Sequence, residues 1–414
     1  MGRNSSFAAI DVGTTKICTL IAEVNGDYEI QITGVGVAPA QGLRKGIVVN
    51  IDETIESIQS SVDKAERASG NRILSAYVGI AGSHISSLNN RGVIAISRND
   101  RLITREDVTR VLESARTISI PSNREVLHVI PRSYILDGQE GVKNPVGMHG
   151  YRLDVETHIV TGAVTSIQNL TKCVTSLGVE VEDLVLEPIA SAEAILTDEE
   201  KEMGVAVVDI GGGTTDLAIF MESSIWHTAV LPVGGYHLTN DIAIGLRTPF
   251  ASAEEIKLRY GYALPELVDA EEEIHSPGFA STNGRRIRRR HLCEVIKARL
   301  EEMLSMVAIE IKRSGYDAML PAGVVLTGGT SNLLGIDNLA SDVLELPVRV
   351  GGPKGIIGVT ESLQNPAFAT SVGLLLWGIK HGSAQRNGQK ARNGLGMGGF
   401  YKRLALWVRE LLPQ

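Results

Sequence analysis

The chain of 414 residues is predicted to be an α/β protein with two lobes. It is longer than one ordinary hydrophobic core requires, and strand-like and helix-like segments alternate along most of it. AAIDVGTTKICTLI at Ala8 and AVVDIGGGTTDLAI at Ala206 also share one pattern, in which an apolar strand leads to Asp, Gly, Thr-Thr and another strand. The two aspartates, Asp11 and Asp209, stand about half the chain apart, which indicates a duplicated unit with two halves that face each other.

The first lobe is expected to contain residues 1–82, 159–204 and 365–379. Alternating apolar runs predict strands at 7–12, 17–24, 29–37, 73–81 and 179–186. Helices are expected at 52–70, near 167–176, from Pro188, and around 369–378. In the first of these helices, Ile55, Ile58, Val62 and Ala65 share one face, and Gly70 is the stop signal.

Residues 83–158 differ from their surroundings and are predicted to form a small α+β module. They hold strand-like pieces at 92–97 and 125–136, a helix at 104–117, and several Gly, Pro and Asn breaks. The second lobe is expected at 205–364, with a small subdomain at about 234–300. The second lobe is also expected to contain a long amphipathic helix at 292–314 and a strand at 323–326.

Composition excludes several classes of protein. The chain is 43% hydrophobic and 21% charged, which is typical of a globular protein. The net charge is −8, but the residues from Lys380 onward carry seven Lys/Arg and one Glu, so the rest of the chain carries −14. Such a body repels nucleic acid. The three cysteines form no C-x-x-C pair, which favours a reducing cytosol over a zinc or disulfide framework. No signal peptide and no membrane-spanning run is recognisable in the sequence.

The two Asp-x-Gly-Thr hairpins have the chemistry of a phosphate clamp. Glycines permit close backbone approach, so that successive N–H groups converge on an anion, and threonine hydroxyls add donors. An aspartate at a strand end can hold a hydrated divalent cation that bridges phosphate oxygens. Lys16 can pair with the phosphates as a point charge. Either motif alone could be a plain hairpin turn, but both together favour a clamp.

A third glycine-containing loop, VVLTGGTSNLLGI, places Gly328 and Gly329 at the end of a buried strand. Ligands of open α/β sheets bind at this edge. The sequence has no G-x-x-x-x-G-K-[ST], H-E-x-x-H or G-x-S-x-G motif, which disfavours P-loop, zinc-protease and α/β-hydrolase chemistry.

DVGTTK, DIGGGTTD and TGGTSNLLGI resemble the two phosphate motifs and the adenosine motif of the actin/Hsp70/sugar-kinase superfamily. LEPIASAEAIL and NPAFATSVGLLLWG resemble its two connecting helices. The resemblance implies a bilobed actin-like ATPase fold, built from duplicated ribonuclease-H-like domains, that binds ATP and Mg²⁺. It implies that Asp11 and Asp209 hold the Mg²⁺ shell through water.

The same resemblance implies a set of nucleotide-binding residues. Those near the phosphates would be Gly13, Thr14, Thr15, Lys16, Gly211, Gly212, Gly213, Thr214 and Thr215. Those near the nucleoside would be Gly235, Gly328, Gly329, Thr330 and Ser331, with Glu254, Glu255 and Lys257 of SAEEIK at the base and ribose. Glu187 stands where relatives carry the residue that positions the attacking water. Alternatively, it is an acid favoured by the dipole at a helix N-terminus.

The position of the module at 83–158 indicates which family of this superfamily the chain resembles. Bacterial actins insert a small subdomain after the third strand, whereas here the extra module lies at 83–158. That displaced, 1C-type arrangement, with IPRSYILDGQEGVKNPVGMHG and GLRKGIVVNIDETIESI, resembles FtsA, the actin-like bacterial cell division family. The resemblance implies a peripheral protein that forms protofilaments on the inner face of the cytoplasmic membrane at the septum. It also implies tethering of FtsZ, recruitment of later divisome proteins, and at most slow ATP hydrolysis. The alternatives are a pilus-assembly relative and a cytosolic sugar or metabolite kinase.

A basic run in the second lobe has two interpretations. It contains Arg285, Arg286, Arg288, Arg289 and Arg290. It is either a solvated charged loop or the docking site of the acidic-hydrophobic FtsZ tail.

The last residues predict a tethered amphipathic helix. Residues 380–399 include six glycines and are expected to be a flexible linker. Over 400–412 one helical face collects Phe400, Tyr401, Leu404, Trp407, Val408, Leu411 and Leu412. Lys402 and Arg409 lie opposite, Arg403 lies on a flank, and Leu406 falls on the polar side. A helix of this length, about 20 Å, is too short to span a bilayer. Aromatic residues beside basic ones favour binding to anionic membrane lipids over docking on the protein itself or in a partner groove.

Overall fold

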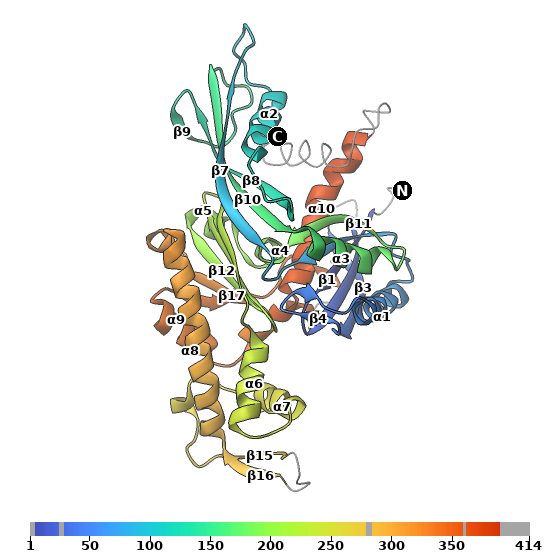
Figure 1. Ribbon diagram of the computed structural model, residues 1–414, viewed down its shortest axis with the longest axis vertical. Helices are drawn as coiled ribbons and strands as arrows, with labels where there is room; N and C mark the ends of the chain where they lie inside the picture. The colour runs from blue at the N-terminus through green and yellow to red at the C-terminus, as the bar shows by residue number, and fades with distance from the viewer. Residues whose placement is uncertain (1–4, 25–28, 279–283, 359–361, 390–414) are drawn as a thin grey trace.

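The structure, a computed structural model, describes residues 5–24, 29–278, 284–358 and 362–389. Two lobes lie side by side, and the inserted module extends from one end of the long axis (Figure 1). Helices α6 (Gly235–Gly245) and α7 (Phe250–Tyr260) and the hairpin of β15 (Glu273–Ser276) and β16 (Arg285–Arg288) lie at the other end. This arrangement is the α/β bilobed fold predicted from the duplicated hairpins.

The first lobe is built on a six-stranded sheet in the order β11-β6-β1-β2-β3-β19. Its strands are β1 (Ser5–Val12), β2 (Lys16–Val24), β3 (Ile30–Pro39), β6 (Ser75–Ile80), β11 (Glu180–Leu186) and β19 (Ile357–Gly358). Helices α1 (Ile51–Ser69) and α3 (Val164–Thr175) cover one face, where Ile10 and Val78 are buried. The opposite face, with Ala9 and Leu20, packs on α4 (Glu187–Ile195) and α10 (Ala369–Gln389). Alternate side chains of each strand thus serve two different cores.

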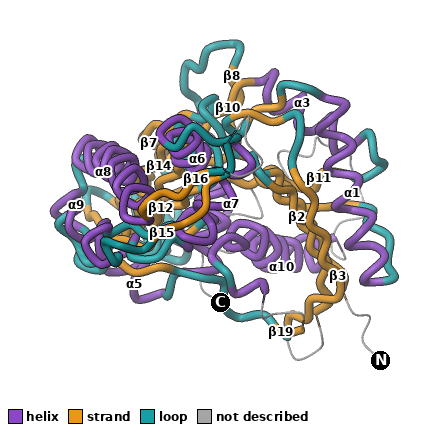
Figure 2. The backbone as a smooth tube through the Cα atoms, turned by 90° about the horizontal axis from the view of Figure 1, so that it is seen from below, coloured by secondary structure: helices purple, strands orange, loops and turns teal. Residues whose placement is uncertain are grey.

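The second lobe has a five-stranded sheet in the order β14-β13-β12-β17-β18. Its strands are β12 (Val205–Ile210), β13 (Thr215–Met221), β14 (Ser224–Leu231), β17 (Val324–Thr327) and β18 (Val348–Val350). One face packs on α6, on α8 (Arg289–Ser314) and on α9 (Ile336–Leu344). The other face shares its core with α4 and α10, so these two helices lie between the sheets. Figure 2 shows α10 in this position. Because α4 and α10 touch both lobes, they fix how the two hairpins face each other.

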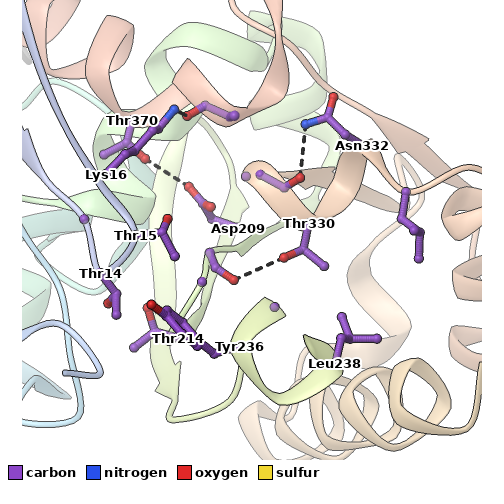
Figure 3. A pocket seen from close by; sticks show the side chains of 18 of the residues that line it. Thr14, Thr15, Lys16, Asp209, Thr214, Tyr236, Leu238, Thr330, Asn332 and Thr370 are labelled. Atoms are coloured by element: carbon purple, nitrogen blue, oxygen red, sulfur yellow. Dashed lines mark hydrogen bonds between the residues drawn. The ribbon is translucent and has the colours of Figure 1, made fainter. Parts of the chain in front are cut away.

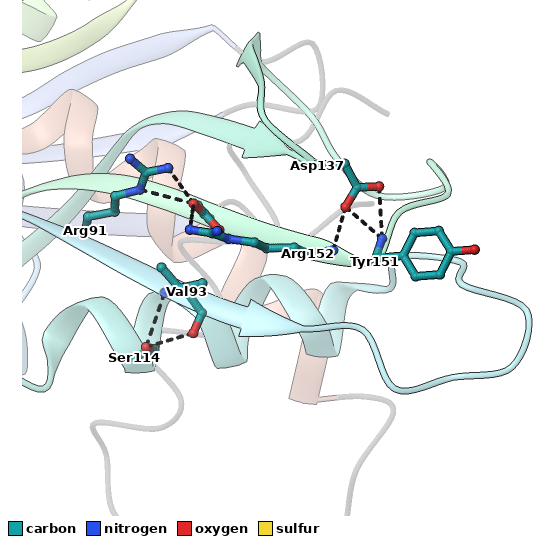
Figure 4. Close-up of polar contacts among 7 residues, drawn as sticks. Arg91, Val93, Ser114, Asp137, Tyr151 and Arg152 are labelled. Carbon is teal, nitrogen blue, oxygen red and sulfur yellow. Dashed lines mark hydrogen bonds and ion pairs between the residues drawn. The ribbon is translucent and has the colours of Figure 1, made fainter.

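The inserted module is a four-stranded antiparallel sheet in the order β7-β10-β8-β9, covered by one helix. The strands are β7 (Ser86–Ala95), β8 (Arg124–Leu136), β9 (Gln139–Val142) and β10 (Arg152–Ala163), and the helix is α2 (Arg105–Arg116). Ser114 Oγ of α2 lies 3.4 Å from the N of Val93 and 3.3 Å from its O, and so satisfies the edge strand β7 (Figure 4). Buried Asp154 accepts hydrogen bonds from Arg91 and Arg152. The edge is therefore closed by side chains of the module itself.

The remaining elements are short. They are the hairpin of β4 (Leu43–Arg44) and β5 (Ile47–Val48), and α5 (Asp198–Met203). No helix in the described ranges is both long enough and apolar enough to cross a bilayer.

Two sequence-based boundaries differ from the structure. The strand expected at 92–97 begins earlier, at Ser86, because it pairs along its length with β10. The final helix does not stop near Gly378 but continues to Gln389, so the expected linker at 380–399 begins as helix. Glycines at 382 and 388 lower helix propensity, but about one kcal/mol each does not end a helix that is already nucleated by packing. The predicted membrane helix at 400–412 lies outside the described residues.

Candidate functional site

A cavity of about 760 Å³ lies between the two lobes, which is the size of a small-molecule site. Both predicted hairpins line it, together with the starts of α6 and α7 and the loop after β17. In Figure 3, Thr14, Thr15 and Lys16 of the first hairpin lie on one side, while Thr330, Asn332 and Leu238 lie on the other. The structure therefore brings together the three motifs that the sequence placed far apart.

The glycines of the second hairpin pack against the threonine side chains of the first hairpin. A Cβ on Gly212 would lie 2.2 Å from Cγ2 of Thr15, and a Cβ on Gly213 would lie 2.8 Å from Oγ1 of Thr14. Only glycine fits at these two positions. The carbonyl of Gly211 accepts hydrogen bonds from the Gly235 N–H at 2.9 Å and from Thr330 Oγ1 at 3.2 Å. The second hairpin is thereby hydrogen-bonded to the start of α6 and to the loop after β17.

Each hairpin aspartate is held by hydroxyl groups from the helices between the lobes. Ser371 Oγ donates to Oδ2 of Asp11 at 2.6 Å. Oδ2 of Asp209 accepts from Ser191 at 2.7 Å and from Thr370 at 3.1 Å. Burial raises the pKa of both carboxyl groups, and these hydrogen bonds oppose the rise. The structure thus fixes two buried carboxylates at the base of the cavity.

Lys16 is the cation of the first hairpin. Its ammonium donates to the carbonyl of Ala367 and lies 3.5 Å from the centre of the Phe368 ring. Burial lowers the pKa of Lys16, and the neighbouring Asp11 opposes that shift. The segment just before α10 therefore holds Lys16 facing the two aspartates.

Sequence reasoning missed a third buried aspartate, Asp216. Thr214 Oγ1 donates to its Oδ2 at 2.9 Å, while its buried Oδ1 has no hydrogen-bond partner among the described residues. Burial raises the pKa of Asp216 to about 8, and Asp209 adds to the rise. The sequence did contain a signal for Asp216, because it ends the motif DIGGGTTD. It stands two residues after Thr214, and alternate residues of a strand point to the same side.

Glu187 stands at the first position of α4 and lines the same cavity. Its pKa is raised well above the ordinary value, first by burial and then by repulsion from Asp11, Asp216 and Asp209. The carboxyl groups of Asp11, Glu187, Asp209 and Asp216 therefore lie with the ammonium of Lys16 at the base of the cavity. This excess of carboxyl oxygens suits a hard divalent cation, whose charge would favour their ionised forms. Among the described residues, no group of three or more His, Cys, Asp or Glu could ligate a metal directly, and the sequence led us to expect Mg²⁺ held through water.

The SAEEIK segment forms part of α7, and its members differ in role. Lys257 lines the cavity, pairs with Glu254 at 2.7 Å and donates to Thr239 Oγ1 at 2.9 Å. Glu255 is exposed and does not line the cavity. One helical turn places Glu254 and Lys257 on one face and Glu255 on another.

Three further predicted residues support the loops instead of lining the cavity. Thr215 Oγ1 donates to Val233 O at 2.9 Å, Ser331 Oγ donates to Gly328 O at 2.7 Å, and Gly213 packs against the first hairpin. Several lining residues were not predicted, because ordinary hydrophobic and polar side chains carry no motif. They are Tyr236, Leu238, Phe250, Leu258, Arg259, Asn332, Leu333, Asn365, Phe368 and Thr370.

The basic run is not a loop. Residues 285–288 form β16, and Arg289 begins α8. Arg289 donates to Tyr260 O at 2.8 Å and pairs with Glu272, while Arg290 donates to Val268 O at 2.7 Å. These two arginines are structural, and Arg285 donates to Leu246 O. Arg286 and Arg288 remain exposed, and Arg286 makes a long ion pair with Glu273 at 3.5 Å.

The family follows from comparison with known proteins. A cell division protein FtsA of Pseudomonas aeruginosa is 48% identical over 374 residues, which are 90% of this chain and 89% of the relative. The chain belongs to the FtsA family. The FtsA of Escherichia coli K12 is 37% identical over 97% of both chains. A family model for the SHS2 domain inserted in FtsA matches residues 82–161, and one for the cell division protein FtsA matches residues 206–373.

Solved structures resemble the fold of this FtsA-family chain. A PilM–PilN type IV pilus biogenesis complex has a TM-score of 0.65 at 18% identity and covers 90% of this chain and 98% of that chain. MreB5 of Spiroplasma citri bound to ADP has a TM-score of 0.53 at 15% identity and covers 94% and 99%. The chain is thus an actin-like cell division protein, and the module predicted at 83–158 corresponds to the SHS2 insertion.

Proposed function

We propose that this protein binds Mg²⁺-ATP between its lobes, polymerises on the inner face of the cytoplasmic membrane and anchors FtsZ filaments there. Nucleotide binding is supported by one observation: the two Asp-x-Gly-Thr hairpins line the same cavity and contact each other. Glycines of the second hairpin pack against threonines of the first, Lys16 supplies a cation, and four acidic side chains favour a divalent ion. A triphosphate with Mg²⁺ matches this combination.

The residues would divide the work as follows. Hairpin N–H groups and threonine hydroxyls would hold the β- and γ-phosphates, and Asp11 and Asp209 would hold the hydrated Mg²⁺. The cation supplies charge neutralisation at the phosphates. Glu187 lines the cavity and would position the attacking water once the charge of a bound cation favours its ionised form, so slow hydrolysis is compatible with the site.

Membrane attachment rests on the sequence of residues 400–412. One copy of such a helix binds weakly, since each Lys or Arg near an anionic surface contributes only about 1 kcal/mol. A filament presents many copies together, and avidity then raises attachment steeply. Nucleotide-supported assembly would therefore control whether the protein stays on the membrane.

The FtsZ tail is proposed to dock beside β16. Arg286 and Arg288 are the exposed cations of this strand, and an acidic-hydrophobic peptide complements them. The inserted module is the proposed surface for later divisome proteins. A pilus-assembly role or a kinase role is less well supported, because the identity to FtsA proteins reaches 48% whereas that to the PilM structure is 18%.

Calorimetric titration with Mg²⁺-ATP tests the cavity. Asp209→Ala should weaken binding by at least about tenfold, which corresponds to about 1.4 kcal/mol. Asp63→Ala, at an exposed position on α1, should bind as the unsubstituted protein does. Equal affinities for both variants would remove the nucleotide assignment.

Vesicle flotation tests the tail. The full chain should float with anionic vesicles, whereas a chain that ends at Gln389, and so keeps α10, should remain at the bottom. Within the full chain, Leu404→Asp should reduce flotation strongly and Leu406→Asp only weakly, since Leu406 falls on the polar face. If the shortened chain floats as well as the full chain, the membrane proposal is wrong.

A further inference from the structure

The turn between β4 and β5 lies at the meeting point of three parts of the molecule. Leu43 pairs with Val48 and Arg44 with Ile47, and the turn itself consists of Lys45 and Gly46. Both turn residues have positive φ, 51° and 74°, which is the type I′ geometry of a tight hairpin. We call these two residues the junction turn.

The junction turn touches both phosphate hairpins. The Gly46 N–H donates to Thr14 Oγ1 of the first hairpin at 3.2 Å, and Gly46 lines the cavity. A Cβ on Gly213 of the second hairpin would lie 3.2 Å from Cα of Lys45. A shift of either hairpin on phosphate binding therefore meets this turn directly.

The junction turn also packs on the start of the inserted module. A Cβ on Gly46 would lie 2.8 Å from Cα of Gly82 and 2.9 Å from O of Ala81. Gly82 is the first residue that the SHS2 family model matches, and Ala81 also lines the cavity. Backbone here lies against backbone, so the contact has no flexible side chain to absorb a movement.

One arginine then joins the turn that enters the module to β10, the strand that leaves it. Arg124 donates to the carbonyl of His84 at 3.0 Å and to the carbonyl of Thr161 at 2.9 Å. Its Nε also donates to Thr161 Oγ1 at 3.0 Å. A displacement at Gly82 is thus passed to both connections of the module at once.

The module is held by the second lobe as well. Ser87 Oγ donates to Thr228 O at 2.8 Å, and His158 Nε2 lies 2.9 Å from Thr228 Oγ1 on β14. Arg132 stacks over Trp226, with its guanidinium carbon 3.8 Å from the ring centre. Because the module contacts both lobes, a change in the angle between the lobes must reposition it.

We propose that the junction turn couples occupancy of the phosphate site to the position of the inserted module. This rests on the nucleotide binding proposed above. Phosphate held between the hairpins alters the contacts of Thr14 and Gly213 with the turn, the turn moves against Gly82, and Arg124 transmits the movement to both module connections. The position of the module then depends on whether nucleotide occupies the cavity between the lobes.

Amide hydrogen exchange on the full chain, with and without Mg²⁺-ATP, tests the coupling, and calorimetry measures affinity in parallel. In the unsubstituted protein, ATP should slow exchange in both hairpins and also in the segments around Gly82 and Thr161. Gly46→Ala places a methyl group against Gly82. At Mg²⁺-ATP concentrations that calorimetry shows to be saturating, it should abolish the response of the module while both hairpins still respond. Gly70→Ala is the matched control, since Gly70 has φ 70° with nothing within 4 Å of a Cβ, and it should keep both responses.

A second variant guards against misfolding at the turn. Arg124→Gln leaves the turn and cavity intact and should keep the response at Gly82 while that near Thr161 is lost. If ATP binds but the module of the unsubstituted protein shows no change, or if Gly46→Ala keeps the full response, the coupling proposal is overturned. If ATP does not bind to the unsubstituted protein, the proposed nucleotide function itself fails, so the two failures are distinguishable.

Discussion

Ser371 donates a 2.6 Å hydrogen bond to Oδ2 of Asp11 and so joins the last described helix to the first hairpin, 360 residues earlier in the chain. Its neighbour Thr370 donates to Asp209 of the second hairpin. Two adjacent hydroxyls of α10 therefore align the aspartates of both lobes. Helix α10 therefore supports both hairpins of the proposed phosphate site.

The first prediction concerns this support. Ser371→Ala should lower the free energy of unfolding by about 1–3 kcal/mol, because a buried carboxyl group loses a hydrogen bond. Urea unfolding measures the effect. Ser176→Ala removes an exposed hydroxyl that bonds only to Lys172 O and should cost less than about 0.5 kcal/mol. Equal losses in the two variants would contradict the supporting role of Ser371.

The second prediction is a pH dependence of stability set by Asp216. Its carboxyl group ionises near pH 3.8 when unfolded and at about 8 in the folded protein. The unfolded chain therefore loses its proton first, and the free energy of unfolding falls as pH rises through this window. Asp216→Asn cannot ionise, so its stability advantage should grow from pH 4 and level off above pH 8, at up to about 5 kcal/mol.

Urea unfolding of Asp216→Asn at several pH values between 4 and 9 checks this prediction. Asp63→Asn, on the exposed side of α1, serves as the control and should follow the profile of the unsubstituted protein. A parallel profile for Asp216→Asn would show that Asp216 ionises normally in the folded protein.

The third prediction concerns the crossing of α4 and α10. A Cβ on Gly373 would lie 1.8 Å from the carbonyl oxygen of Ala190, so the two helices approach through bare backbone. Gly373→Ala should lower the unfolding free energy by about 1–3 kcal/mol through overpacking. The matched change is Gly245→Ala in α6, where a Cβ would lie 3.5 Å from Cγ2 of Val295, and it should be neutral or stabilising by up to about 1 kcal/mol. Thermal unfolding of both variants measures whether each substitution stabilises or destabilises the protein. A stabilising effect of Gly373→Ala would contradict the close approach of α4 and α10.

The fourth prediction separates the arginines of the basic run. The double change Arg286→Glu and Arg288→Glu should weaken binding of an FtsZ tail peptide about three- to tenfold at low salt, since both side chains are exposed. Fluorescence anisotropy measures the affinity. Lys312→Glu with Arg313→Glu makes the same charge change at the opposite end of α8 and should leave peptide binding nearly unchanged. Equal weakening by both pairs would indicate a general charge effect instead of a docking site.

Local sequence patterns were sufficient for the repeated hairpins, the main strands and helices, and the residue types that bind phosphate. Each of these depends on contacts between near neighbours in the chain, such as strand alternation, helix stop signals and glycine-permitted turns. Asp11, Lys16, Asp209 and Gly328 were identifiable for this reason. The tail at 400–412 is also known only from its sequence pattern.

Only the tertiary structure decided the properties that arise from distant segments. The pKa of Asp216 is raised by burial and by the charge of Asp209, and the motif DIGGGTTD by itself indicates neither effect. Glu255 differs from Glu254 because only one of them faces the cavity, and Arg289 differs from Arg286 because Tyr260 and Glu272 bind it. The sequence determines which chemical groups and local turns are available, whereas burial, charge coupling and helix length depend on which remote residues pack against them.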